Sequence, residues 1–251
     1  MLRAARNASD RLGVVIPVGA VEQHGAHLPV TCDTDIAVGA AAAVSDALEQ
    51  TGRYRAWVAP AIPYGPVPGA DLTPGTSAVS FDVLGAYLSA VVDGFAVTRQ
   101  WDFLVMVNAH AHNHGRVIEA SSRAFTAHRV PAIVLQVYEF MSVCDGLDLV
   151  PGSHGAEFEI ALHHFYTGAS PIPGRVPDVT PRPRPASIYG LDLLPRSRGG
   201  IIGPNVPDVD RARRAAPDVG RRINAAMAAR AIGDLDTFEA HWRESQDREA
   251  R

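Results

Sequence analysis

The feature that most constrains the fold of this chain is a series of short, almost wholly apolar runs. They lie at residues 14–18, 56–59, 103–107 and 132–137. Runs of this length without polar alternation are typical of strands buried on both faces, as in a parallel sheet. Amphipathic or alanine-rich stretches between them predict covering helices at 36–50, 81–99 and 115–128. The sequence therefore predicts an α/β protein, a three-layer sandwich with a mostly parallel central sheet and helices on both faces.

The rest of the chain fits a single domain over residues 1–251. Further helices are predicted at 155–166, 210–232 and 234–244, a short strand at 76–80, and a loop at 141–153. Thr34 or Asp35 is a suitable N-cap for the first helix. Residues 168–185 carry six prolines, which excludes a regular element there. We interpret about 168–207 as an irregular, proline-rich arm over the site.

Composition excludes several classes of function. The net charge of −4 and the absence of a basic patch argue against a nucleic-acid partner. The chain has no lysine, which excludes Schiff-base and P-loop chemistry. No apolar run approaches the ~20 residues of a membrane-spanning helix, and two cysteines cannot build a disulfide framework. We expect a cytoplasmic protein with no membrane contact.

Polar clusters follow the first and third apolar runs and recur after the fourth. Glu22 and His24 come shortly after the first run, and Asp33 follows them. His110 comes just after the third run, and His154 opens a cluster beyond the fourth. Sites in parallel sheets lie outside the carboxyl ends of the strands, so these groups can converge. Carboxylates with imidazoles suit Zn²⁺, Fe²⁺ or Mn²⁺; the alternative is a loop with one core histidine and solvated acids.

The three clusters resemble the signatures of one family. The segment from Glu22 to Pro29, followed by Asp33, resembles the E-Q-H-G-x-H-L-P motif and aspartate of the creatininase (creatinine amidohydrolase) family. The segment 108–113 is similar to that family's N-G-H-G-G-N, and 154–159 to its H-A-G-E-x-E-T-S. Pro74-Gly75-Thr76 resembles a further signature. Order and spacing match over roughly residues 12–165.

The resemblance implies two divalent metal ions per chain (Zn, Fe or Mn). One is held by Glu22, Asp33 and His110, and the other by His24, the bridging Asp33 and one more ligand. Glu159 matches the glutamate of E-T-S and is our first choice for that ligand; Glu157 and His112 are the alternatives. Two residues apart on a helix, Glu157 and Glu159 point about 200° apart and cannot both face one metal.

His154 matches the catalytic histidine that heads the third signature, and we expect it to protonate the departing nitrogen. Glu157, one turn on if the segment is helical, is the second catalytic candidate. His27 is expected to orient a ligand. His128, His163 and His164 are expected to be structural. Cys32 lies next to Asp33, but a small buried thiol is the favoured interpretation.

The sequence therefore predicts a metal-dependent amidohydrolase that cleaves a non-peptide C–N bond in a small cyclic amide or formamide. A peptidase of the mycofactocin-precursor branch of the family is the main alternative. A catalytically silent binding protein of the same fold is the alternative from another class, since Ala111 and His112 replace glycines of the second signature. The resemblance also implies a homo-oligomer, with a hexamer as the expected assembly.

Overall fold

The computed structural model describes residues 11–68, 74–98, 100–150, 154–171 and 206–249. The central sheet has four strands in the order β2-β1-β3-β4, and all three pairings are parallel. The strands are β1 (Arg11–Val18), β2 (Tyr54–Val58), β3 (Phe103–Asn108) and β4 (Ala132–Gln136). Every residue of β3 is buried, as the unbroken apolar run predicts for a central parallel strand.

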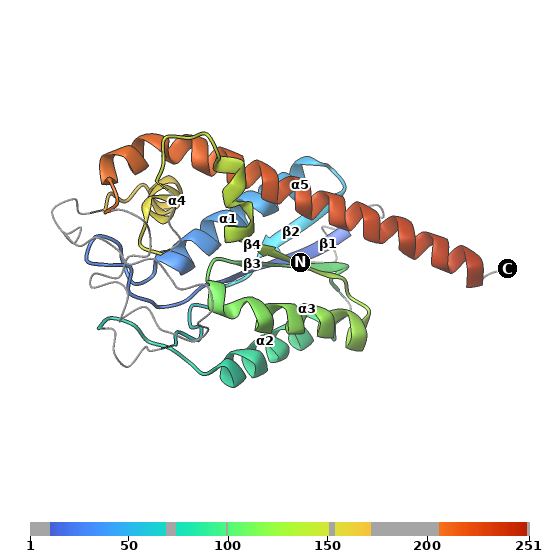
Figure 1. Ribbon diagram of the computed structural model, residues 1–251. Coiled ribbons are helices and arrows are strands. Elements are labelled where there is room, and N and C mark those ends of the chain that lie inside the picture. The colour runs from blue at the N-terminus through green and yellow to red at the C-terminus, as the bar shows by residue number, and fades with distance from the viewer. Residues whose placement is uncertain (1–10, 69–73, 99, 151–153, 172–205, 250–251) are drawn as a thin grey trace, which may run out of the picture.

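Helices cover both faces of the sheet, which confirms the three-layer architecture (Figure 1). One layer holds α2 (Phe81–Ala96) and α3 (His114–His128), and the other holds α1 (Cys32–Gln50), α4 (Glu157–Thr167) and α5 (Val209–Glu249). Short 3₁₀ segments, η3 (Ala111–Asn113) and η4 (Val137–Cys144), follow β3 and β4. Within the described residues, no helix is long and apolar enough to cross a membrane.

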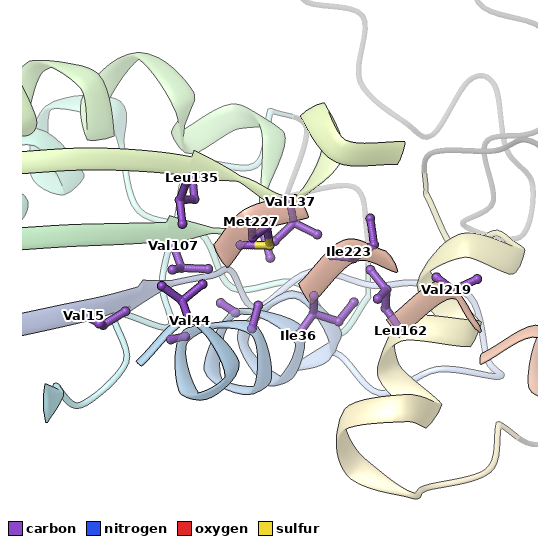
Figure 2. Packing of buried hydrophobic residues seen from close by; sticks show 14 of the residues in the cluster. Val15, Ile36, Val44, Val107, Leu135, Val137, Leu162, Val219, Ile223 and Met227 are labelled. Carbon is purple, nitrogen blue, oxygen red and sulfur yellow. The ribbon is translucent and has the colours of Figure 1, made fainter. Parts of the chain in front are cut away.

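Two apolar clusters hold the layers together, because successive strand residues point to opposite faces. Val15 and Val107 face the α1, α4 and α5 layer, where they join Ile36, Leu162 and Ile223 (Figure 2). The second cluster lies between the other face of the sheet and the α2 and α3 layer. It contains the strand residues Val14, Ile16, Leu104 and Met106 together with Leu84 and Leu88 of α2. Full burial of one such side chain contributes about 1.5–3 kcal/mol, so the sheet is a rigid support for the loops at its edge.

The element boundaries differ from the sequence prediction in several places. The first helix begins at Cys32, so Asp33 and Asp35 lie within its first turn and neither Thr34 nor Asp35 is the N-cap. The predicted strand at 76–80 is reduced to an isolated bridge between Val21 and Ser77. The 3₁₀ segment η4 begins at Val137, the last residue of the predicted fourth strand, and extends to Cys144 within the predicted loop.

The two predicted C-terminal helices form one continuous helix, α5, which contains Pro217 and Gly233. A glycine inside a helix costs about 1 kcal/mol relative to alanine, and buried Ala231 and Leu235 on either side of Gly233 offset that cost. Most of the predicted proline-rich arm, residues 172–205, lies outside the described residues.

Candidate metal centre

The predicted ligands meet at one edge of the sheet, although they come from four different segments. Glu22 and His24 lie in the loop after β1, and His110 follows the end of β3. Asp33 is in the first turn of α1 and Glu159 in the first turn of α4. All five side chains are buried, with at most 4% of any residue exposed. The parallel topology explains this convergence, since it places the carboxyl ends of β1 and β3 side by side.

The first donor group consists of Glu22, Asp33 and His110. His110 Nδ1 lies 3.2 Å from Glu22 Oε2 and 3.0 Å from Asp33 Oδ2. The other ring nitrogen, Nε2, is 3.0 Å from the carbonyl oxygen of Pro66 and donates to it. This hydrogen bond places the proton of the neutral ring on Nε2, which leaves the Nδ1 lone pair directed at the two carboxylates.

The second donor group consists of His24, Asp33 and Glu159. His24 Nε2 lies 3.2 Å from Asp33 Oδ1 and 3.6 Å from Glu159 Oε2. His24 Nδ1 donates to the carbonyl oxygen of Glu22 at 2.9 Å, so the Nε2 lone pair is free in the neutral ring. Asp33 therefore presents one carboxylate oxygen to each group, and in each group the donor atoms lie within 4.8 Å of one another.

Several donor atoms are buried without a hydrogen-bond partner: Glu22 Oε1, His24 Nε2 and Asp33 Oδ2. His24 and Asp33 approach their neighbours closely, yet these atoms form no well-directed hydrogen bond. An unsatisfied buried polar atom costs about 1–3 kcal/mol, and several in one place require a common explanation. A divalent cation among these closely spaced donors would supply the partner that they lack.

The electrostatics of the cluster also favour a bound cation. Burial lowers the pKa of His110, but the carboxylates of Asp33 and Glu22 outweigh it and raise that pKa to about 10. Burial likewise opposes protonation of His24, yet Glu159 and Asp33 raise its pKa well above the usual value. The negative electrostatic potential of these carboxylates, which keeps protons on two buried imidazoles, also attracts metal ions. The residues present therefore fit the pair of divalent ions expected from the sequence.

Glu157 and His112, the alternatives to Glu159, lie elsewhere. The Glu157 carboxylate accepts from Arg211 Nε at 2.9 Å and also from the backbone N–H groups of Val150 and Asp208. His112 is exposed, with its ring centroid 5.2 Å from that of His110. Among the described residues, neither belongs to a donor group.

His154 lies beside the two donor groups. The residue is 7% exposed, and its ring packs on that of His24 with a centroid distance of 4.3 Å. Nε2 donates to the carbonyl oxygen of Gln23 at 2.7 Å, while Nδ1 lies 3.8 Å from Glu22 Oε2. His154 also forms a third possible donor group with Glu22 and His24, so its position suits either proton transfer or metal binding.

The remaining histidines and Cys32 lie outside the donor groups. His27 Nε2 is 2.9 Å from the Gly155 carbonyl oxygen, which links the first and third motifs. Three further histidines make structural contacts: His128 with Asp93, His163 with Asp35, and His164 with the Ala169 carbonyl oxygen. Cys32 is buried in the apolar core, and burial raises its thiol pKa.

Sequence reasoning missed Tyr138 and Gln136, which support the site together with Gly155 and Asn108 from the predicted motifs. The Tyr138 hydroxyl donates to Glu159 Oε1, and the Gly155 N–H donates to Oε2. Asn108 Nδ2 donates to Gln136 Oε1 at 2.6 Å and to the His110 carbonyl oxygen at 2.7 Å. Asn108 is the first residue of the second motif, whereas the only sequence signal for Gln136 is its position near the end of the fourth apolar run.

Known proteins resemble this chain over most of its length. The family model described as creatininase (creatinine amidohydrolase) matches residues 2–234. A mycofactocin precursor peptide peptidase of Mycobacterium tuberculosis (strain H37Rv) is 35% identical over 242 residues, which cover 93% of this chain and 87% of that protein. The peptidase of the same name from Mycolicibacterium smegmatis is 36% identical over 100 residues, 40% of each chain.

Solved structures show the same fold. A structure described as manganese creatininase has a TM-score of 0.72 at 22% identity, with 93% of both chains covered. A creatininase mutant of the Zn-Zn type has a TM-score of 0.68 at 21% identity, covering 87% of this chain and 90% of that one.

Proposed function

The chain belongs to the creatininase family of hydrolases, and from this membership and its buried donor groups we propose that it is a metallopeptidase acting on a short precursor peptide. Two divalent ions would be held by Glu22, His24, Asp33, His110 and Glu159. The observation that carries the metal-dependent mechanism is that Asp33 presents one oxygen to the first donor group and the other oxygen to the second. The peptide substrate is supported by the 35% identity over 93% of the chain to a mycofactocin precursor peptide peptidase.

When bound, such an ion pair lowers the pKa of water from 15.7 toward ~7 and polarises the scissile carbonyl group. The protein's own residues then manage the protons. Because His154 Nε2 donates to the Gln23 carbonyl oxygen, the neutral ring carries its lone pair on Nδ1. That nitrogen can accept a proton from the attacking water and return it to the departing amine. Burial of His154 excludes bulk water from this transfer.

We assign Glu157 a structural role rather than a catalytic one. Its carboxylate is already neutralised by Arg211 and makes hydrogen bonds on both oxygens. It therefore ties the start of α4 to the start of α5. Tyr138 and the Gly155 N–H instead hold the Glu159 carboxylate in place for the second ion.

A small cyclic amide or formamide is the second candidate substrate. It is favoured by the burial of the donor groups, since a reacting site with at most 4% exposure of each ligand suits a small group. The complete set of donors in both groups argues against the silent binding protein.

Hydrolysis assays with purified protein separate these possibilities. We would load the chain with Mn²⁺ or Zn²⁺, count the ions by mass spectrometry, and incubate it with a mycofactocin precursor peptide, creatinine and N-formyl amides. We expect about two ions per chain and cleavage of the peptide. Cleavage of only the small amides would favour the second candidate, and the absence of bound metal would refute a metal-dependent mechanism.

A further inference from the structure

Gln23, between the ligands Glu22 and His24, is fixed at three points. Its backbone N–H donates to Thr76 Oγ1 at 3.1 Å, and its carbonyl oxygen accepts from His154 Nε2 at 2.7 Å. Its side-chain Oε1 accepts from the backbone N–H of Gly25 at 3.1 Å. Gly25 has a φ of 75°, a conformation that favours glycine. The side-chain amide is thus held in one orientation.

These contacts leave the amide nitrogen of Gln23 as a spare donor. The Gly25 N–H requires an acceptor, which fixes Oε1 on that side and Nε2 on the other. Nε2 lies 3.5 Å from His154 Nε2, but that ring nitrogen already donates to the Gln23 carbonyl oxygen and cannot accept as well. Within the described part of the chain, Gln23 Nε2 therefore has no well-placed acceptor. The residue is only half-buried.

We propose that the Gln23 side-chain amide donates a hydrogen bond to the substrate carbonyl oxygen as that oxygen becomes negatively charged. This inference rests on the proposed hydrolase function. The water oxygen bonds to the carbonyl carbon, and the π electrons of the carbonyl group move onto its oxygen. The C=O bond then re-forms while the C–N bond breaks, and His154 delivers the proton to the nitrogen. A donor fixed in advance near the developing charge accelerates this step.

The test uses two substitutions that remove the amide N–H donors in different ways. Gln23→Glu keeps an acceptor for the Gly25 N–H, whereas Gln23→Met is neutral and close in size. Gln50→Met is the matched control, because Gln50 is exposed at the end of α1, far along the chain from every ligand. Each protein is assayed with whichever probe the wild type cleaves, and its metal content and melting temperature are measured in parallel.

We expect both Gln23 variants to keep two metals and to lose about 10²-fold in kcat, the usual cost of removing one such donor. kcat and kcat/KM should fall together, since the bond strengthens only in the transition state. The loss should be equal for amides with different leaving groups, because the donor acts on the carbonyl oxygen. Gln50→Met should behave as the wild type does.

Wild-type kcat in either Gln23 variant would refute the inference while leaving the hydrolase function standing. A loss that accompanies metal loss, or that varies with the pKa of the leaving amine, would also refute it, since Gln23 would then act through the ligands or through His154. If the wild type cleaves none of the probes, the proposed function itself fails, and the inference with it.

Discussion

Replacing Glu157 by glutamine should destabilise the fold and leave both metals in place. The Glu157 residue has no exposed surface. One carboxylate oxygen accepts from the Asp208 N–H at 2.8 Å and from Arg211 Nη2 at 2.5 Å. The other accepts from the Val150 N–H and Arg211 Nε, each at 2.9 Å. In either orientation, the glutamine NH₂ group faces one backbone N–H and one guanidinium N–H.

The cost follows from those contacts. Breaking a buried ion pair by removing one partner costs about 3–5 kcal/mol. We expect the lower end of this range, about 3 kcal/mol, because the Arg211 side chain is 26% exposed and can be rehydrated. For a chain of this size, 1 kcal/mol shifts the melting temperature by about 2–4 °C, so the metal-free protein should melt roughly 6–12 °C lower.

Glu159→Gln is the matched comparison, two residues away on the same helix. The glutamine Oε1 can still accept from the Gly155 N–H, and the Tyr138 hydroxyl can rotate to accept from the new NH₂ group. The metal-free melting temperature should therefore fall by less than in Glu157→Gln, while one metal is lost. Calorimetry and metal analysis of both variants test this pair. The reverse pattern, with metal loss in Glu157→Gln at unchanged stability, would refute our assignment.

Four further outcomes follow from the same geometry. Asp33→Ala should lose both ions and all turnover, because Asp33 contributes one oxygen to each of the two proposed metal sites; two retained metals by mass spectrometry would contradict the bridging role. His154→Ala should keep its metals and lose ~10²–10⁴-fold in turnover, less for weakly basic leaving amines, and metal loss would instead make His154 a ligand. Added Mn²⁺ or Zn²⁺ should raise the melting temperature, since a ligand that binds only the native state stabilises it, and Asp33→Ala should abolish the rise. Light scattering should show the homo-oligomer that family resemblance implies, and a monomer would contradict it.

The sequence predicted the architecture well because its signals were local. Unbroken apolar runs identified the parallel strands, and motifs directly after those runs placed Glu22, His24 and His110 at one edge. The 200° separation of Glu157 and Glu159 on a helix also agrees with their opposite environments in the structure.

Contacts between segments that are distant along the chain could not be predicted from the sequence. Glu157 and Arg211 are 54 residues apart, and periodicity within either helix says nothing of that pairing. Tyr138 lies in a 3₁₀ segment where the prediction had only the end of a strand and a loop, so its contact with Glu159 was not foreseeable. The continuity of α5 likewise depended on burial around Gly233, which local propensity opposes.

Glu157 and Glu159 differ in whether a permanently charged partner balances the carboxylate. Glu157 has a guanidinium partner in Arg211, so its charge is balanced in every state of the protein. Glu22, Asp33 and Glu159 form ion pairs, among the described residues, with histidines alone. Asp33 and Glu159 gain some support from the first turns of α1 and α4, where the helix dipole supplies about +0.5 charge. This partial positive charge is too small to balance the negative charge of three buried carboxylates. The balance must come from protons on His24 and His110 or from divalent cations. Two bound cations would displace those protons and would also coordinate the carboxylate oxygens that lack a hydrogen-bond partner.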